Sequence, residues 1–224
     1  MPLRGGVGRS ESFWRRLRRS HAKVRAVATD MSKAYIRAIR DNLRGVVHVF
    51  DHFHVIKLFN DKLSDLRRAL YREATDVLQK QVLKGTRWLL LKNPENLDTA
   101  KDEKRRLEEA LALNKPLATA YYMKEDLRRF WEQPGKRFAT LFLNDWIRRA
   151  GASGIKMLQQ LAATLAAYRS GLLAYYDVMI TSGPLEGTNN KIKTMKRQAY
   201  GFRDREFFKL KILAIHETRY ELVG

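Results

Sequence analysis

Two short apolar runs near the start of the chain have the pattern of buried strands, and a helical pattern lies between them. Residues 24–30 (VRAVATD) and 46–50 (VVHVF) are rich in β-branched residues, which is typical of strands covered on both faces. Apolar residues within 31–45 recur at helical spacing. A strand, a helix and a second strand in such a short stretch predict a βαβ unit, whose right-handed crossover makes the strands parallel.

An acidic residue stands at the end of each predicted strand, Asp30 after the first and Asp51 after the second. In neighbouring parallel strands the carboxyl ends lie at the same edge of the sheet, where α/β folds bind their ligands. We therefore expect the two carboxylates to face one site. The alternative is that each Asp caps the helix that follows it, a role that Asp often fills.

From Phe53 onward the strand pattern disappears and helical periodicity continues to residue 180. The apolar stripe of the first long helix consists of four hydrophobic residues and the aliphatic stem of a lysine: Val55, Phe59, Lys62, Leu66 and Leu70. Further helices are predicted over residues 97–114, 117–133, 136–150 and 154–180. Aromatic and aliphatic residues at helical spacing are expected in their core, among them Tyr121, Leu127, Phe130 and Trp131.

The two ends of the chain are polar and basic. Residues 1–12 contain three Gly and no apolar periodicity, which predicts a frayed start, and residues 13–23 predict a short basic helix. In the C-terminal tail, Ser182 is a candidate N-cap for a helix whose first turn includes Pro184 and Glu186.

This tail places an acid and two amides beside cations. Glu186, Asn189 and Asn190 stand close to Lys191 and Lys193, which is an unusual polarity for a packed helix. Carboxylate and amide oxygens beside cations are what a metal site that grips a phosphodiester needs. Alternatively, Glu186 has only a structural role, because a carboxylate near the start of a helix interacts favourably with the positive end of the helix dipole.

The charge balance points to a polyanionic partner. The 224 residues include 44 Lys and Arg against 24 Asp and Glu, a net charge of +20, and each phosphate that such a protein neutralises releases condensed counterions. No apolar run approaches the roughly 18 residues of a membrane span. The chain has no cysteine, which excludes disulfides and thiolate metal sites and fits a cytoplasmic protein. We therefore expect a nucleic acid, and no membrane, as the partner.

Three stretches of the sequence closely resemble the DDE transposases of bacterial insertion sequences, specifically the ISL-three type. They read VATDMSKAY, VFDHFHVIKLFNDKLSDLRR and SGPLEGTNNKIKTMKRQAYGFRD. The resemblance extends from about Trp14 to the C-terminus, and the third stretch is the most specific, since few other proteins place these residues in this order.

The resemblance implies a mostly α fold with a small α/β part. Residues 13–52 and 181–224 would form a partial ribonuclease-H-like core that retains two parallel strands, and residues 53–180 would be a large all-helical insertion. In the family an Asp-Asp-Glu triad holds two divalent ions, usually Mg²⁺, for hydrolysis and strand transfer at insertion-sequence ends.

Residue by residue, the resemblance matches Asp30 to the second Asp of the triad and Glu186 to the Glu, so that both would bind Mg²⁺. It makes Asp51 a supporting residue or a rival for the second Asp, with Asn189 and Asn190 as further supporting residues. The cations expected along the DNA backbone belong to the same tail: Lys191, Lys193, Lys196, Arg197, Arg203 and Arg205.

The first Asp of the triad has no counterpart, because no acidic residue before Asp30 lies in strand-like sequence. We therefore expect an N-terminally truncated transposase, inactive alone, that assembles with itself or with an intact transposase on DNA. The main alternative is a DNA-binding protein without catalysis that regulates an intact transposase. A metal site formed by Asp51, His52 and His54 is a third interpretation.

Overall fold

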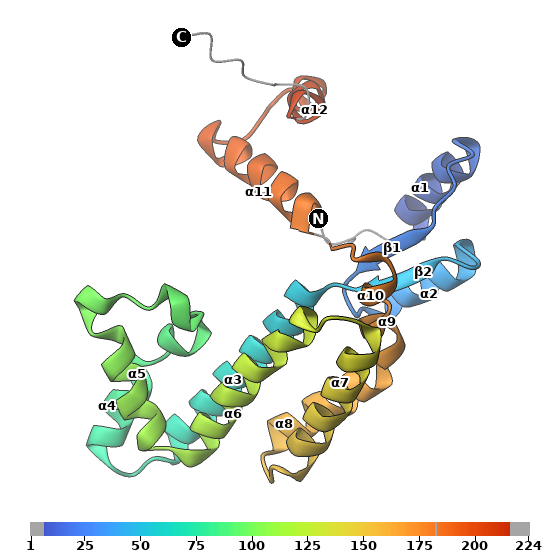
Figure 1. Ribbon diagram of the computed structural model, residues 1–224. Helices are drawn as coiled ribbons and strands as arrows, with labels where there is room; N and C mark the ends of the chain where they lie inside the picture. The colour runs from blue at the N-terminus through green and yellow to red at the C-terminus, as the bar shows by residue number, and fades with distance from the viewer. Residues whose placement is uncertain (1–6, 182, 216–224) are drawn as a thin grey trace, which may run out of the picture. The chain divides into compact units, whose positions relative to one another are not determined.

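The computed structural model describes residues 7–181 and 183–215, except for the side chains of residues 7–10 and 184–186. The described chain is helical apart from one two-stranded parallel sheet (Figure 1), which confirms the expectation of a mostly α fold with a small α/β part. It divides into two compact units, which are Met1–Lys23 with Thr181–Gly224, and Val24–Ile180.

The sheet of the second unit has the predicted βαβ connection. Strand β1 (Ala26–Thr29) pairs in parallel with β2 (Val47–Phe50), residue 26 opposite 47 and residue 29 opposite 50, and helix α2 (Lys33–Asn42) joins them. The turn into β2 contains Gly45 with a φ of 74°, a left-handed conformation that glycine adopts without steric cost.

Helix α3 (His52–Glu73) is the long helix that the apolar stripe predicted. Its buried residues are Val55, Phe59 and Leu63, at intervals of four. Lys62 of the predicted stripe is half-buried, and its ammonium donates to Gln160 Oε1 at 3.2 Å, while its neighbour Leu63 is fully buried.

The remaining segments of this unit form a helical block (Figure 1). In chain order they are α4 (Val77–Gly85), η1 (Leu89–Leu91), η2 (Pro94–Asn96), η3 (Thr99–Lys101), α5 (Glu103–Ala112), α6 (Lys115–Arg128), η4 (Arg129–Glu132), α7 (Lys136–Ala152), α8 (Lys156–Ala167), α9 (Arg169–Leu173) and α10 (Tyr175–Val178). The helix predicted over 97–114 is interrupted at Asp102, whose φ is 51°, and the one predicted over 154–180 is three shorter helices.

The core of the block is apolar and aromatic, and α3 lies beside α6 within it. Trp146 is fully buried, its ring centroid lies 6.2 Å from that of Phe59, and its Nε1 donates to the Met123 carbonyl at 2.9 Å. Of the four predicted core residues, Tyr121, Leu127 and Phe130 are buried and Trp131 is partly buried.

The sheet is fixed to this block through β2 and α9. A Cβ added at Gly171 would lie 2.3 Å from the ring of Phe50, so the glycine allows the helix to approach the strand closely. The Phe50 ring also packs edge-on against Tyr168, with centroids 5.3 Å apart. The carboxyl edge of the sheet is therefore held by a packed aromatic contact.

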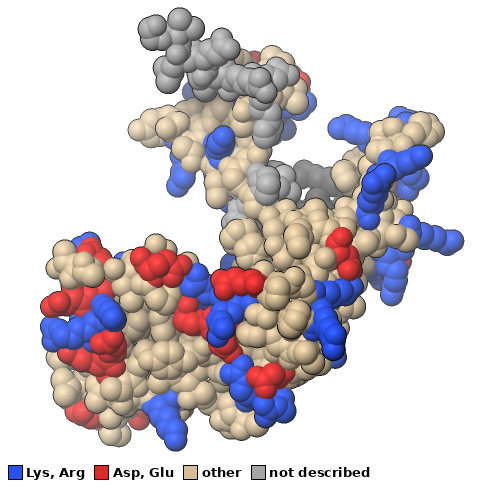
Figure 2. Space-filling view, viewed as in Figure 1, with Lys and Arg blue, Asp and Glu red and all other residues tan. Residues whose placement is uncertain are grey.

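The surface of the block carries interspersed acidic and basic side chains, as Figure 2 shows over α5. Arg105 pairs with Asp102 at 3.3 Å and with Glu109 at 2.9 Å on one helical face. Pairs of this kind neutralise one another within the protein.

The first unit consists of α1 (Val7–Arg19), α11 (Gly183–Gln198) and α12 (Arg205–Ala214). Helix α1 begins at Val7, inside the stretch that the glycines predicted to be frayed. Asp204 caps α12 by accepting from the amides of Glu206 and Phe207. No side chain that the structure describes in this unit is buried. In either unit, none of the described helices has the length and apolarity of a membrane span.

Candidate functional site

Asp30 and Asp51 lie side by side at the carboxyl edge of the sheet, as the strand order predicted. Each follows the last residue of its strand, and the two strands end opposite one another, Thr29 beside Phe50. The Asp51 amide donates to the Thr29 carbonyl at 2.9 Å, which continues the ladder as far as the acids. One edge of the sheet thus carries two carboxyl groups.

The Asp30 carboxylate is half-buried and organises the start of α2. Its Oδ1 accepts from the Ser32 amide at 2.9 Å, while Ser32 itself occupies the N-cap position and makes no capping bond with its side chain. Asp30 therefore supports the helix start from two residues before the cap and keeps access to solvent.

The Asp51 carboxylate is only 1% exposed. It occupies the N-cap position of α3 but makes no capping bond, because its Oδ2 lies 3.1 Å from His54 Nδ1. His52 Nδ1 lies 3.7 Å from Oδ1 of the same group. Asp51 thus stands at the N-cap position that the alternative predicted, but its carboxylate contacts His54 and does not cap the helix.

Two histidines near this edge have pKa values below the ordinary value for the residue. Burial lowers the pKa of His48, whose Nε2 lies 2.7 Å from Thr29 Oγ1. Burial also lowers the pKa of His52, against the opposing effect of the Asp51 charge. The contact of His48 with Thr29 depends on strand register and was not visible in the sequence, whereas the i, i+3 spacing of Asp51 and His54 was.

The candidate acid of the tail, Glu186, lies in the first part of α11. Its side chain falls outside the described residues, as does the whole of the predicted N-cap Ser182. Asn189 is half-buried and Asn190 is exposed. The helix predicted from Pro184 and Glu186 is therefore present, while the position of the Glu186 carboxylate stays a prediction.

The six tail cations expected on DNA are all exposed. Lys193, Lys196 and Arg197 line one shallow depression on α11 together with Asn190, Tyr200 and Gly201. Lys191, Arg203 and Arg205 lie outside that depression. Over the part of the chain that the structure describes, none of the six forms an ion pair, in contrast to Arg105 of α5. The depression can therefore accept an anion.

The described side chains contain no group of three or more His, Asp or Glu that could hold a metal ion. The interpretation of Asp51, His52 and His54 as a metal site has no support within these residues. The carboxylate oxygens of Asp30, at an edge with access to solvent, are nonetheless the hard ligands that Mg²⁺ prefers. The donor set at this edge fits one part of a magnesium site.

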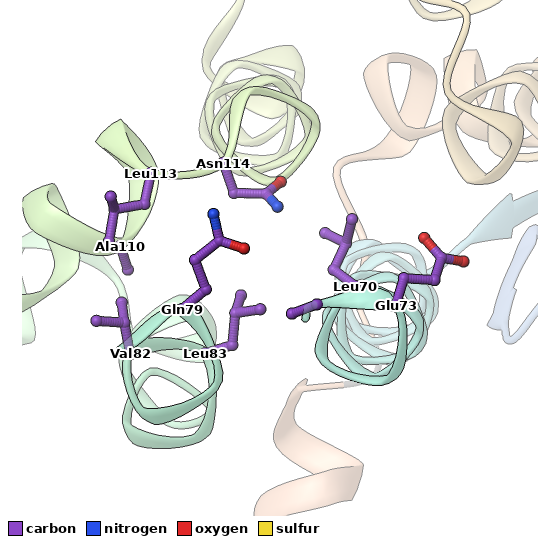
Figure 3. A pocket seen from close by; sticks show the side chains of 9 residues that line it. Leu70, Glu73, Gln79, Val82, Leu83, Ala110, Leu113 and Asn114 are labelled. Carbon is purple, nitrogen blue, oxygen red and sulfur yellow. The ribbon is translucent and has the colours of Figure 1, made fainter. Parts of the chain in front are cut away.

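A separate cavity of about 200 Å³ lies between α3, α4 and α5 (Figure 3). Leu70 and Glu73 of α3 line it, together with residues of α4, of α5 and of the link between α5 and α6: Gln79, Val82, Leu83, Ala110, Leu113 and Asn114. None of the predicted site residues contributes to this cavity.

Comparison with known proteins identifies relatives of a single kind. The sequence model of a transposase family, the DDE transposases of the ISL3 (ISL-three) type, matches residues 8–212. The transposase for insertion sequence element IS1001 of Bordetella parapertussis is 37% identical over 196 residues, which are 86% of this chain and 47% of that protein. The transposase for insertion sequence element IS1557 of Mycobacterium tuberculosis (strain CDC 1551 / Oshkosh) is 26% identical over 204 residues, 81% of this chain and 45% of that protein.

The chain therefore spans about half the length of the curated relatives it matches. No solved structure matches it significantly.

Proposed function

Because the chain belongs to the DDE transposases of the ISL3 type, we propose that it takes part in metal-dependent phosphodiester hydrolysis and strand transfer at insertion-sequence ends. The observation that supports this most is the sheet edge, where Asp30 and Asp51 follow adjacent parallel strands. Ligands of α/β folds bind at such an edge. The partner would be DNA and the fold of the core ribonuclease-H-like.

Asp30 is the better candidate for the second Asp of the triad. Its carboxylate has access to solvent, whereas that of Asp51 is buried and bound to His54. In our proposal Asp51 is a supporting residue, because the hydrogen bond from its backbone amide to the Thr29 carbonyl fixes the backbone next to Asp30.

Asp30 and Glu186 would together hold divalent ions, usually Mg²⁺ in this family. Such ions, when bound, activate an attacking oxygen and stabilise the leaving oxygen of an in-line displacement. The protein's own part is to present carboxylates at one edge and cations along the DNA. Lys193, Lys196 and Arg197 would bind phosphates in the depression on α11, supported by Asn190.

In this proposal the first Asp of the triad comes from outside these residues. Glu11 is the only acid before Asp30, and it lies on α1 in an ion pair with Arg18 at 3.0 Å. We therefore propose that these 224 residues do not complete the catalytic site alone. A further segment, another copy or an intact transposase would supply the missing carboxylate.

Iron-directed cleavage tests the metal site without requiring strand transfer. Fe²⁺ replaces Mg²⁺, and ascorbate with peroxide produces hydroxyl radicals that cut the polypeptide next to the bound ion. Mass spectrometry should find cuts beside residues 30 and 186, and Asp30→Asn should abolish both. Asp41→Asn, at an exposed acid on α2, should leave them unchanged. Cuts that persist in Asp30→Asn, or that never occur near residue 186, would show that the two acids do not share an ion.

A non-catalytic DNA-binding protein is the second candidate function, and the unpaired cations of α11 favour it. This candidate predicts salt-sensitive binding of duplex DNA with no iron-directed cuts at residues 30 and 186. It also predicts that Asp30→Asn and Glu186→Gln leave DNA affinity in Mg²⁺ unchanged. Fluorescence anisotropy of a labelled duplex, with and without Mg²⁺, separates the two candidates.

A further inference from the structure

Helix α2 carries a row of exposed cations that the sequence interpretation did not assign. Lys33, Arg37 and Arg40 are spaced by four and three residues and share one face of the helix, and Arg44 follows in the loop after the helix ends at Asn42. All four side chains are exposed. We call these four residues the α2 row.

The opposite face of α2 fixes the direction in which the row points. Ile39 is 6% exposed, and Ile36 packs against the hydrophobic core. Since these two residues face inward, the cations at 33, 37 and 40 face solvent in a fixed register. In Figure 2, blue side chains gather where Figure 1 places α2.

The row has little internal neutralisation. Asp41 lies 3.6 Å from Arg37 and 3.5 Å from Arg40, and those two arginine side chains are 80% and 75% exposed. Within the described residues Lys33 and Arg44 form no ion pair, so Asp41 neutralises only part of the positive charge of the row. An exposed pair contributes at most about 1 kcal/mol, so a phosphate can replace Asp41.

The row begins beside the candidate catalytic edge. Lys33 follows Asp30 by three residues and opens the helix that the Asp30 carboxylate supports. From residue 33 to residue 40 helix α2 extends about 10 Å at about 1.5 Å per residue, and Arg44 follows beyond the end of the helix at Asn42. A duplex presents a phosphate about every 3.4 Å along each strand, so the row can contact several consecutive phosphates.

We propose that the α2 row binds the phosphate backbone of duplex DNA next to the acids, independently of base sequence. This inference rests on the proposed function, because it assumes that DNA approaches the Asp30 edge. It adds to the tail cations a second surface, in the same compact unit as Asp30. Backbone contacts of this kind set the position of a duplex and carry no sequence information.

Site-directed DNA cutting tests the position of the row. The natural chain has no cysteine, so a single introduced cysteine labels one place only. Ala34→Cys, exposed on α2, and Ala112→Cys, exposed on α5, would each carry an iron chelate that cuts nearby DNA. The label at 34 should cut both an insertion-sequence end and an unrelated duplex, and the label at 112 should cut neither. Equal cutting from the two positions, or cutting from 112 alone, would overturn the proposal.

Charge reversal gives an independent measurement. Lys33→Glu/Arg37→Glu/Arg40→Glu and the matched variant Lys104→Glu/Lys115→Glu/Lys156→Glu each lower the net charge by six, and all six side chains are exposed. The α2 variant should reduce the slope of log affinity against log salt by about 2 to 3, because each phosphate contact contributes about 0.9. The matched variant should change it by less than about 1. Circular dichroism before each titration shows that both variants are folded.

The outcomes separate the two proposals. If the unmodified chain binds no duplex DNA, the proposed function fails and this inference fails with it. If the unmodified chain binds and both triple variants bind with equal slopes, the inference about α2 fails and the proposed function stands.

Discussion

The two compact units carry the same net charge in very different lengths of chain. Residues 1–23 and 181–224 together hold 16 Lys and Arg and six Asp and Glu, a net charge of +10 (16 − 6) in 67 residues. Residues 24–180 hold 28 and 18, also +10 (28 − 18), in 157 residues. The smaller unit is thus more than twice as dense in excess positive charge.

The two units differ in the number of acidic residues and in how many basic side chains these acids pair with. In the larger unit Arg128 lies 2.8 Å from both Glu95 and Glu125, and these hydrogen bonds raise its pKa above the ordinary value. In the smaller unit the ion pairs among described residues are Arg18 with Glu11 and Lys209 with Glu206. Charges that are satisfied within the protein stabilise the fold, whereas unpaired ones are available to a partner.

Burial separates the units in the same way. The larger unit has a continuous core around Phe59 and Trp146, and no described side chain of the smaller unit is buried. We infer that the larger unit folds by its own core and that the smaller one is a surface for binding. The predictions below test this division, beginning with the largest effect.

The largest effect is expected from truncation of the central tryptophan. Trp146→Ala removes a fully buried indole and its bond to Met123, so it should lower the free energy of unfolding by about 3–5 kcal/mol. Trp88→Ala, at a side chain that is 64% exposed, should cost less than about 1 kcal/mol. Urea denaturation followed by circular dichroism measures both. Equal losses would show that Trp146 is not the centre of the core.

The second effect is a loss of stability at alkaline pH that depends on Tyr121. Burial, with a smaller effect of the Glu125 charge, raises the pKa of Tyr121 to about 12 from its ordinary 10. Between pH 10 and 12 the unfolded chain therefore releases this proton before the folded chain does. Stability attributable to Tyr121 is lost as the pH rises through that window, by up to roughly 2–3 kcal/mol.

Two phenylalanine variants isolate this contribution. Tyr121→Phe should show a smaller decline in unfolding free energy between pH 10 and 12 than the unmodified chain. Tyr122→Phe, at a neighbouring ring that is 60% exposed, should decline as the unmodified chain does. Parallel curves for all three proteins would contradict the burial of Tyr121.

A third, smaller effect concerns DNA and leaves stability unchanged. Lys196→Ala should weaken duplex binding by about fivefold, or about 1 kcal/mol, and lower the salt slope by about one, because it removes one phosphate contact from the α11 depression. Its unfolding free energy should stay within about 0.5 kcal/mol. Lys156→Ala, an exposed lysine of the helical block, should change neither quantity. Anisotropy titrations at several salt concentrations provide the comparison.

Local patterns in the sequence predicted the parts of the fold that depend on near neighbours. The β-branched runs placed both strands, and the acids that end them placed one edge of the sheet, because parallel pairing follows from the short crossover. The same two acids, Asp30 and Asp51, identified the candidate site from the sequence.

Contacts between distant residues could not be predicted in this way. Glu103 is almost buried because its carboxylate accepts from the Asp98 amide and from Lys92 Nζ, and this loop interrupts the helix that periodicity predicted there. Leu63 of α3 is fully buried although the predicted stripe did not include it, because its burial depends on packing against the other helices. The row on α2 has clear spacing, but its exposure depends on which face Ile39 buries.

The smallest effect tests whether the smaller unit lacks a core. Leu213 on α12 is 67% exposed, whereas Leu161 on α8 is fully buried. Leu213→Ala should change the unfolding free energy by less than about 0.5 kcal/mol, and Leu161→Ala should lower it by about 2–5 kcal/mol. The two changes remove the same atoms, so the difference between them reports burial alone. A loss above about 1 kcal/mol for Leu213→Ala would mean that the apolar face of α12 is covered in solution, and the smaller unit would then be a packed element and not only a binding surface.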